Sequence, residues 1–171
     1  MLRKVNLPHA VTGRLYLSGL PGRKQRFADA LREMADEDID IIVCLAEIAE
    51  VEREAPEYAA AIEVRSLPSA HHWFSIPDGG VPKDETAFVR MLMELVERLR
   101  NGSRTLVHCR AGFGRSGTAA VCALLLLGVP VAHALELVDN AGSGPETSEQ
   151  EAFIDSFAAF VRASGSRVHE E

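Results

Sequence analysis

The 171-residue sequence has few cysteines, and they are widely spaced: Cys44, Cys109 and Cys122. An odd set of three does not form a disulfide framework, and there is no C-x-x-C pair to suggest a zinc site. We therefore predict three free thiols in a reducing compartment, each of which needs its own explanation.

The sequence also lacks a long apolar run and a positive net charge. Its longest apolar run, Ala119–Leu127, is far shorter than the roughly 20 residues that span a bilayer. The first residues contain no apolar stretch followed by a small-residue cleavage site. A net charge of −7 argues against general binding to nucleic acid or to anionic membranes. We expect a cytoplasmic protein with no nucleic-acid or membrane partner, monomeric by default.

Lysine is absent where a nucleotide-binding loop would need it. The stretch Val107–Thr118, VHCRAGFGRSGT, is rich in glycine, but no lysine occurs after Thr105. A Walker-type loop requires a lysine to reach the phosphates, so that class is excluded. His108 and Cys109 are neighbours in an expected strand and point to opposite faces, which makes them a poor chelating pair. We therefore expect no metal here.

The remaining composition is that of one soluble globular domain, with 47% hydrophobic and 25% charged residues. Strand-like and helix-like segments alternate, which predicts an α/β fold with a central, mostly parallel sheet flanked by helices. We expect a single domain over residues 1–171, with a core at about 14–162 and a frayed tail at 164–171. The expected strands cover 14–18, 39–45, 62–67 and 105–108, with a loop at 66–81; the expected helices cover 24–37, 88–99, 116–127, 131–140 and 148–161.

The glycine-rich stretch suits a cysteine nucleophile. Cys109 ends a central strand immediately before a helix N-terminus, where α/β sheets bind ligands and where anions are stabilised. Gly112 and Gly114 allow a tight turn whose N–H groups point inward as a nest for an anion. The helix dipole and Arg115 favour the thiolate, and Arg115 can hold two oxygens of an oxyanion. Ser116 can donate to the sulfur. These residues predict a cup for a tetrahedral oxyanion above Cys109.

The segment HCRAGFGRS resembles the H-C-x5-R-[ST] signature of the cysteine-dependent protein phosphatases. The resemblance extends from Leu15 to Phe160. Over this range the sequence is most similar to the cyclin-dependent-kinase-associated phosphatases of the dual-specificity branch, which have the same segments in the same order: GLPG, IIVCLAE, HH, IPDGGVP and GSG. The resemblance implies the fold of dual-specificity and tyrosine phosphatases, a phosphocysteine intermediate, no cofactor and a phosphorylated protein as substrate. It implies a shallow site for phosphotyrosine and for phosphoserine or phosphothreonine. The residues that it assigns to substrate binding are Arg110, Ala111, Gly112, Phe113, Gly114 and Arg115.

The resemblance also implies a general acid, and Asp78 in IPDGGVP fits that role. Pro77 stiffens one side of Asp78 and two glycines loosen the other, as in a mobile lid that carries a catalytic group. A turn-forming aspartate in P-D-G is the simpler alternative. Asp84 is the other candidate acid, although it also fits the N-cap of the next helix. Because Cys109 must be ionised while Asp78 is protonated, we expect a bell-shaped pH profile with an acidic optimum.

Three further roles remain open. By the resemblance Gln150 positions the hydrolytic water, but it also fits a capping box with Thr147. Cys44 is a buried core thiol or a redox partner of Cys109. His108 braces the loop, and Phe113 is expected to face the surrounding protein.

The substrate is also open. Arg110 replaces a residue that is typically uncharged in the relatives, and this extra cation could favour acidic phosphopeptides, inositol phosphates or phosphoinositides. The alternatives to a phosphoprotein phosphatase are therefore a phosphoinositide or small-phosphomonoester phosphatase, or a non-catalytic module that captures phosphoproteins.

Overall fold

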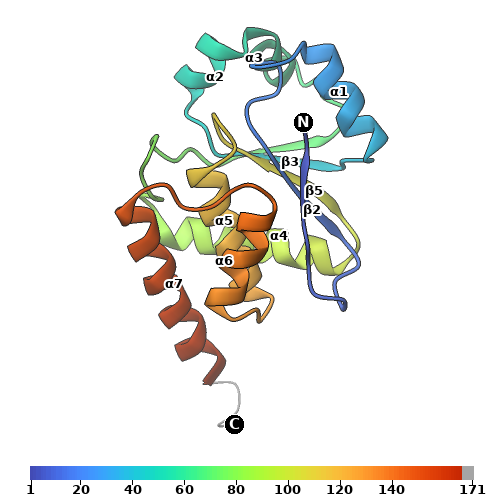
Figure 1. Ribbon diagram of the computed structural model, residues 1–171. Coiled ribbons are helices and arrows are strands. Elements are labelled where there is room, and N and C mark those ends of the chain that lie inside the picture. Colours follow the sequence, from blue (N-terminus) through green and yellow to red (C-terminus); the bar gives the residue numbers. More distant parts are fainter. Residues whose placement is uncertain (167–171) are drawn as a thin grey trace.

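The computed structural model describes residues 1–166, which form one five-stranded sheet between two layers of helices (Figure 1). The strands lie in the order β1-β2-β5-β3-β4, in which β1 is antiparallel to β2 and the other neighbours are parallel. This confirms the expected α/β domain with a mostly parallel sheet. The strands are β1 (Arg3–Val5), β2 (Arg14–Ser18), β3 (Ile41–Cys44), β4 (Ala70–Trp73) and β5 (Arg104–His108).

The helices cover both faces of the sheet because the central strands are apolar on both sides. Leu17, Val43 and Val107 belong to the core on the α4–α7 side, whereas Ile42 and Leu106 pack on the opposite side. One layer contains α1 (Phe27–Asp36), α2 (Ile48–Glu54) and α3 (Pro56–Glu63). The other contains α4 (Glu85–Arg100), α5 (Gly114–Leu126), α6 (Val131–Asn140) and α7 (Ser148–Ser166).

Two expected segments differ from the structure. The strand expected at 62–67 is wrong, because α3 continues to Glu63 and a turn with a positive φ of 53° at Arg65 follows it. The fourth strand, β4, lies instead within the segment expected to be a loop, where it pairs with β3. The tail expected from residue 164 is helical as far as Ser166, and residues 167–171 lie outside the described part of the chain.

The strand order places the glycine-rich stretch at the centre of the molecule. β5 lies between β2 and β3, and it leads directly into α5, of which nearly every residue is buried. Residues 109–115, which we call the cup, therefore form the connection between the central strand and a central helix. Within residues 1–166, no helix combines the length and the apolar character that a membrane span requires.

Candidate active site

The carbonyl groups of the cup are turned outward. The carbonyl oxygen of Arg110 accepts a hydrogen bond from the Leu20 N–H at 3.1 Å. The carbonyl oxygen of Gly112 accepts one from the Ser143 hydroxyl at 3.0 Å and another from the Arg3 guanidinium. The C=O and the N–H of a trans peptide point in opposite directions, so the N–H groups that follow these carbonyls face the inside of the cup. The cup therefore presents N–H donors to an anion.

The sulfur of Cys109 lies at the floor of this cup. Its Sγ accepts a hydrogen bond from the Gly112 N–H at 3.3 Å and lies 3.5 Å from the Ser116 hydroxyl oxygen. Gly112 adopts a φ of +83°, and a side chain there would collide with the backbone of Ser18. The Gly112 N–H thus donates to the sulfur, whereas the Ser116 hydroxyl donates to the Phe113 carbonyl at 3.0 Å in this arrangement.

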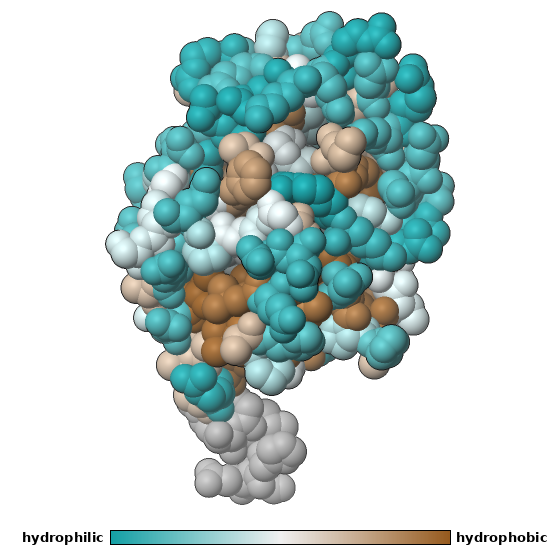
Figure 2. Space-filling view, in the orientation of Figure 1, coloured by the Kyte–Doolittle hydropathy of each residue, from teal (hydrophilic) through white to brown (hydrophobic). Residues whose placement is uncertain are grey.

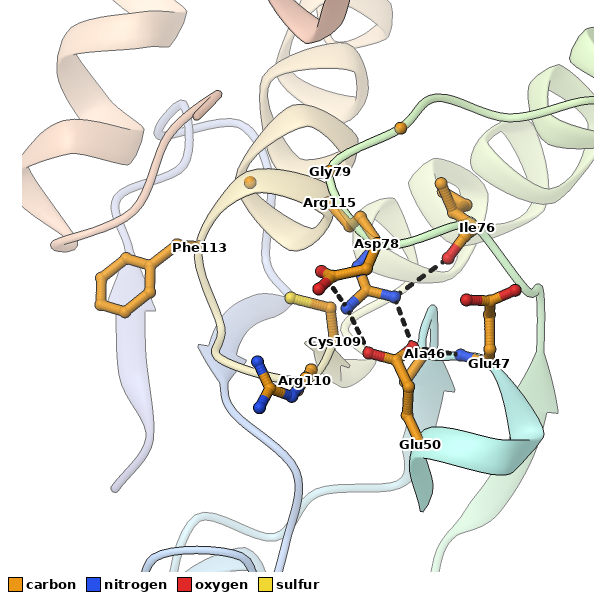
Figure 3. A network of polar contacts seen from close by, with 12 residues as sticks. Ala46, Glu47, Glu50, Ile76, Asp78, Gly79, Cys109, Arg110, Phe113 and Arg115 are labelled. Carbon is orange, nitrogen blue, oxygen red and sulfur yellow. Dashed lines mark hydrogen bonds and ion pairs between the residues drawn. The ribbon is translucent and has the colours of Figure 1, made fainter. Parts of the chain in front are cut away.

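Arg115 is held at the cup by three acceptors. Its two terminal nitrogens bind the two carboxylate oxygens of Glu50 at 2.7 and 2.9 Å, and they also donate to the Ile76 carbonyl and to Asp78 Oδ1 (Figure 3). The Arg115 side chain is 2% exposed, and that of Glu50 is 8% exposed. Burial by itself would raise the pKa of Glu50, but its hydrogen bonds with Arg115 lower it. A buried, bidentate partner thus fixes the orientation of the guanidinium.

Asp78 lies at the mouth of the cup, in contact with Arg115. Its Oδ1 lies 2.9 Å from Arg115 Nη2, and its side chain is 63% exposed. The carboxyl group is thus accessible to solvent, and Figure 3 shows it bound to the Arg115 guanidinium. Asp84, the other candidate acid, accepts a hydrogen bond from the Ala87 N–H at 2.9 Å and is the N-cap of α4.

The start of α7 holds the loop that carries Asp78. The Thr147 hydroxyl donates to the Gly79 carbonyl at 3.0 Å, and Gln150 Nε2 donates to the Gly80 carbonyl at 3.1 Å. Gln150 Oε1 accepts from the Glu146 N–H at 2.8 Å, and the Gln150 N–H bonds to the Thr147 hydroxyl at 3.2 Å. The amide of Gln150 is therefore engaged with backbone groups in this arrangement. To orient a water molecule, it would first have to release one of them.

Two other side chains at the cup were not anticipated. Glu146 Oε2 accepts a hydrogen bond from the Gly114 N–H at 2.8 Å, so a carboxylate occupies one of the donors that an oxyanion would use. The Arg3 guanidinium stacks on the Phe113 ring, with Arg3 Cζ 4.9 Å from the ring centroid. Phe113 therefore packs on one side against Arg3 of the surrounding protein, while 41% of the residue is exposed at the rim, next to the exposed Ala111.

His108 supports the cup from the protein interior. Its Nδ1 lies 3.2 Å from the carbonyl oxygen of Cys109, which can only accept, so Nδ1 carries a proton. Its Nε2 lies 2.7 Å from the Tyr58 hydroxyl, which also lies 3.1 Å from His71 Nε2. Burial lowers the pKa of His108 to about 3. The imidazole is thus neutral at any pH well above 3, which suits a bracing role and not acid–base catalysis.

The second cysteine near the cup is a thiol in the core. Cys44 stands opposite His108 in the register of β3 and β5 and is fully buried. Burial raises its pKa to about 12, so it is protonated at neutral pH and a poor nucleophile. Within the described part of the chain, no three His, Cys, Asp or Glu side chains gather into a group that could hold a metal ion.

We predict that Arg3→Ala lowers kcat/KM for an aryl phosphate by about 10-fold or more. Arg3 bridges the carbonyls of Gly112 and Gly142, and a charged hydrogen bond contributes about 1.5–3 kcal/mol. Without it, the Gly112 carbonyl keeps only the Ser143 hydroxyl, so the Gly112–Phe113 peptide can rotate more easily and withdraw its N–H from the anion. Lys4→Ala, on the same strand, is the matched control. Equal rates for the parental protein and Arg3→Ala would remove Arg3 from the support of the cup.

The chain matches known proteins over most of its length. The model of the family described as "Swiss Army Knife protein, DSP-PTPase phosphatase domain" matches residues 17–167. The cyclin-dependent kinase inhibitor 3 of Rattus norvegicus is 30% identical over 168 residues, which cover 89% of this chain and 77% of that protein.

Solved structures show the same fold. A kinase-associated phosphatase whose catalytic-site cysteine is replaced by serine superposes with a TM-score of 0.82 at 23% identity, over 95% of this chain and 96% of that chain. PTPMT1 in complex with PI(5)P superposes with a TM-score of 0.72 at 18% identity, over 88% and 94% of the two chains. Together with the match of the family model to residues 17–167, these similarities establish that the chain belongs to the DSP-PTPase phosphatase family.

Proposed function

We propose that the protein is a cysteine-dependent phosphatase that hydrolyses phosphoproteins through a phosphocysteine intermediate. The observation that carries this proposal is the position of the Cys109 sulfur, which lies below a ring of inward N–H groups and beside the buried Arg115. In the proposed complex, the N–H groups of the cup and Arg115 bind the phosphoryl oxygens, and the Gly114 N–H joins them once it has released Glu146. Membership in the phosphatase family supports this reaction class.

In the first step the Cys109 thiolate attacks phosphorus, an S–P bond forms and the ester P–O bond breaks. Asp78 gives its proton to the leaving oxygen, so the product departs as an alcohol or a phenol. The developing charge on the phosphoryl oxygens is stabilised by the cup N–H groups and by Arg115, which requires that Asp78 release Arg115 Nη2.

In the second step a water molecule attacks the phosphocysteine, the S–P bond breaks and inorganic phosphate forms. Asp78, now ionised, takes the proton of the water, and the Ser116 hydroxyl stabilises the departing thiolate. Gln150 positions the water once it has released its present partners.

The exposed mouth of the cup supports phosphotyrosine and also phosphoserine or phosphothreonine as substrates. Phe113 and Ala111 lie at the surface, so the rim is low enough for short side chains to reach Cys109. The relatives named for cyclin-dependent kinases make a phosphorylated kinase one candidate substrate.

We predict that the intermediate can be trapped. Acid quenching during turnover of an aryl phosphate should leave one phosphoryl group on Cys109, detected by peptide mass spectrometry, and the same amount should form in the presence of a chelator. A phosphoryl group on another residue, or turnover without any labelled protein, would contradict the proposed reaction. A burst of one equivalent of the phenol without further turnover would favour a binding module.

A phosphoinositide phosphatase is the second candidate. The observation that favours it is the cationic Arg110 within the cup, together with the similar fold of PTPMT1 solved with PI(5)P. A panel of phosphotyrosyl and phosphothreonyl peptides and phosphoinositide headgroups, compared by kcat/KM, discriminates between the two candidates.

A further inference from the structure

One carboxylate beside the cup holds three arginines. Glu54, the last residue of α2, accepts hydrogen bonds from Arg110 Nε at 2.7 Å, from Arg23 Nε at 2.6 Å and from Arg53 Nη2 at 3.0 Å. The hydrogen bond from Arg110 is the largest of the effects that hold the pKa of Glu54 down to about 2. A carboxyl group with a depressed pKa stays ionised above that value, so the cluster persists in acidic assay buffers. Three cations around one anion leave an excess of positive charge.

Two of these arginines have free hydrogen-bond donors. Arg110 and Arg23 both bind Glu54 through Nε, and within residues 1–166 neither donates a hydrogen bond from its terminal nitrogens. Their side chains are 37% and 22% exposed, respectively. A guanidinium has five donors in a fixed plane, so each of these side chains can still bind a second oxyanion with its outer edge.

A cavity connects these donors with the cup. Its volume is about 240 Å³, which is below the roughly 300 Å³ of pockets for whole small molecules and suits one or two side chains. Glu33 is the only carboxylate of the described residues that line it, against several cations. The lining includes Arg3, Arg23, Lys24, Arg110, Ala111 and Phe113.

We propose that Arg110 and Arg23, held by Glu54, form a second anion subsite, and that the preferred substrate is a phosphopeptide segment with an acidic side chain close to the phosphorylated residue. Arg110 directly follows Cys109, and the cavity that it lines also reaches Ala111 and Phe113 at the rim of the cup, so a group bound there lies near a phosphoryl group in the cup. This inference rests on the proposed function, because it requires that the phosphate occupy the cup.

The surroundings of the cavity favour a peptide over a lipid headgroup in a membrane. The helices on this side expose acidic residues, among them Asp36, Glu52 and Glu57, and the face over α1–α3 is hydrophilic (Figure 2). An anionic bilayer is attracted by a broad basic face, but here the exposed arginines on and beside α1 and α2 are interspersed with carboxylates, in a chain of net charge −7, and the cavity is a recess between them. A peptide side chain can enter such a recess without bringing a charged surface with it.

The experiment compares two phosphotyrosyl peptides that differ only in having Glu or Gln on both sides of the phosphotyrosine. We expect the parental protein to favour the Glu peptide about tenfold in kcat/KM, equivalent to about 1.4 kcal/mol, and less at high ionic strength. Arg23→Gln and Arg110→Gln should each bring this ratio close to one. The ratio reports the subsite, because damage to the cup lowers both rates together. Arg26→Gln is the matched control, since Arg26 pairs with Asp29 outside the cavity.

Binding of the same peptides to Cys109→Ser protein, followed by fluorescence anisotropy, gives a second readout that needs no turnover. Equal affinities for the two peptides, or a preference that survives both substitutions, would overturn the subsite. If the parental protein hydrolysed a phosphoinositide faster than the Glu peptide, and both variants lost that activity, the substrate of the subsite would be a lipid and not a peptide. Tighter binding of the Glu peptide without hydrolysis by the parental protein would support the subsite and refute the proposed function.

Discussion

Cys109→Ser is expected to lower turnover of an aryl phosphate by at least about 10⁴-fold, the largest effect of any single substitution in this chain. A serine hydroxyl is a much weaker acid than a thiol, and removal of the nucleophile of a covalent enzyme lowers the rate by about this factor or more. The measurement is the steady-state rate of phosphate release under saturating substrate. Binding of inorganic phosphate should persist, because the N–H groups of the cup and Arg115 do not depend on the sulfur.

The matched control is Cys122→Ser, which replaces a buried thiol within α5, away from the cup. Burial raises the pKa of Cys122, so that thiol has no nucleophilic role, and its replacement should affect stability more than rate. Parental turnover by folded Cys109→Ser protein would exclude the phosphocysteine route.

The second large effect concerns Asp78 and depends on the leaving group. Asp78→Asn should lower kcat for an alkyl phosphate by about 10²- to 10⁴-fold, since an alkoxide must leave with a proton. An activated aryl phosphate, whose phenolate leaves unaided, should lose much less. Because the variant no longer places a carboxylate on Arg115 Nη2, its affinity for phosphate should be unchanged or higher. The measurement is kcat across a series of leaving groups.

Asp84→Asn separates Asp78 from the other candidate acid. Asp84 caps α4 through the Ala87 N–H, and asparagine also caps helices well, so activity should change little and equally for all leaving groups. Equal losses for alkyl and aryl substrates in Asp78→Asn would remove Asp78 from the acid role. A leaving-group dependence in Asp84→Asn would transfer that role to Asp84.

Much of the fold was predictable because the central elements have strong local patterns. The apolar stripe of α4 and the buried run of α5 identify helices without reference to other parts of the chain. The fourth strand was not predictable in this way. Its residues, AHHW, include no β-branched side chain, and only pairing with the exposed edge of β3 makes them a strand.

The residues proposed to react stand in a local sequence motif, but the residues that support them do not. Cys109 and Arg115 stand in a dense local motif, whereas Glu50 is one of several glutamates in AEIAEVERE. Only the fold selects Glu50, by placing α2 against Arg115. Arg3 lies in a three-residue strand more than a hundred positions before the glycine whose carbonyl it binds. Contacts of such long sequence separation leave no periodic trace in a single sequence.

The strand order also has a consequence for how the chain folds. β5 comes last in the sequence but lies between β2 and β3, so those two strands have no common neighbour until residues 104–108 are available. Earlier in folding or in synthesis, the apolar strands 14–18 and 41–44 expose unpaired edges, which are sites of aggregation. Pairing across such sequence distances is intrinsically slow. The cup is thus formed only after the last strand closes the sheet, and partly folded chains should lack phosphate binding altogether.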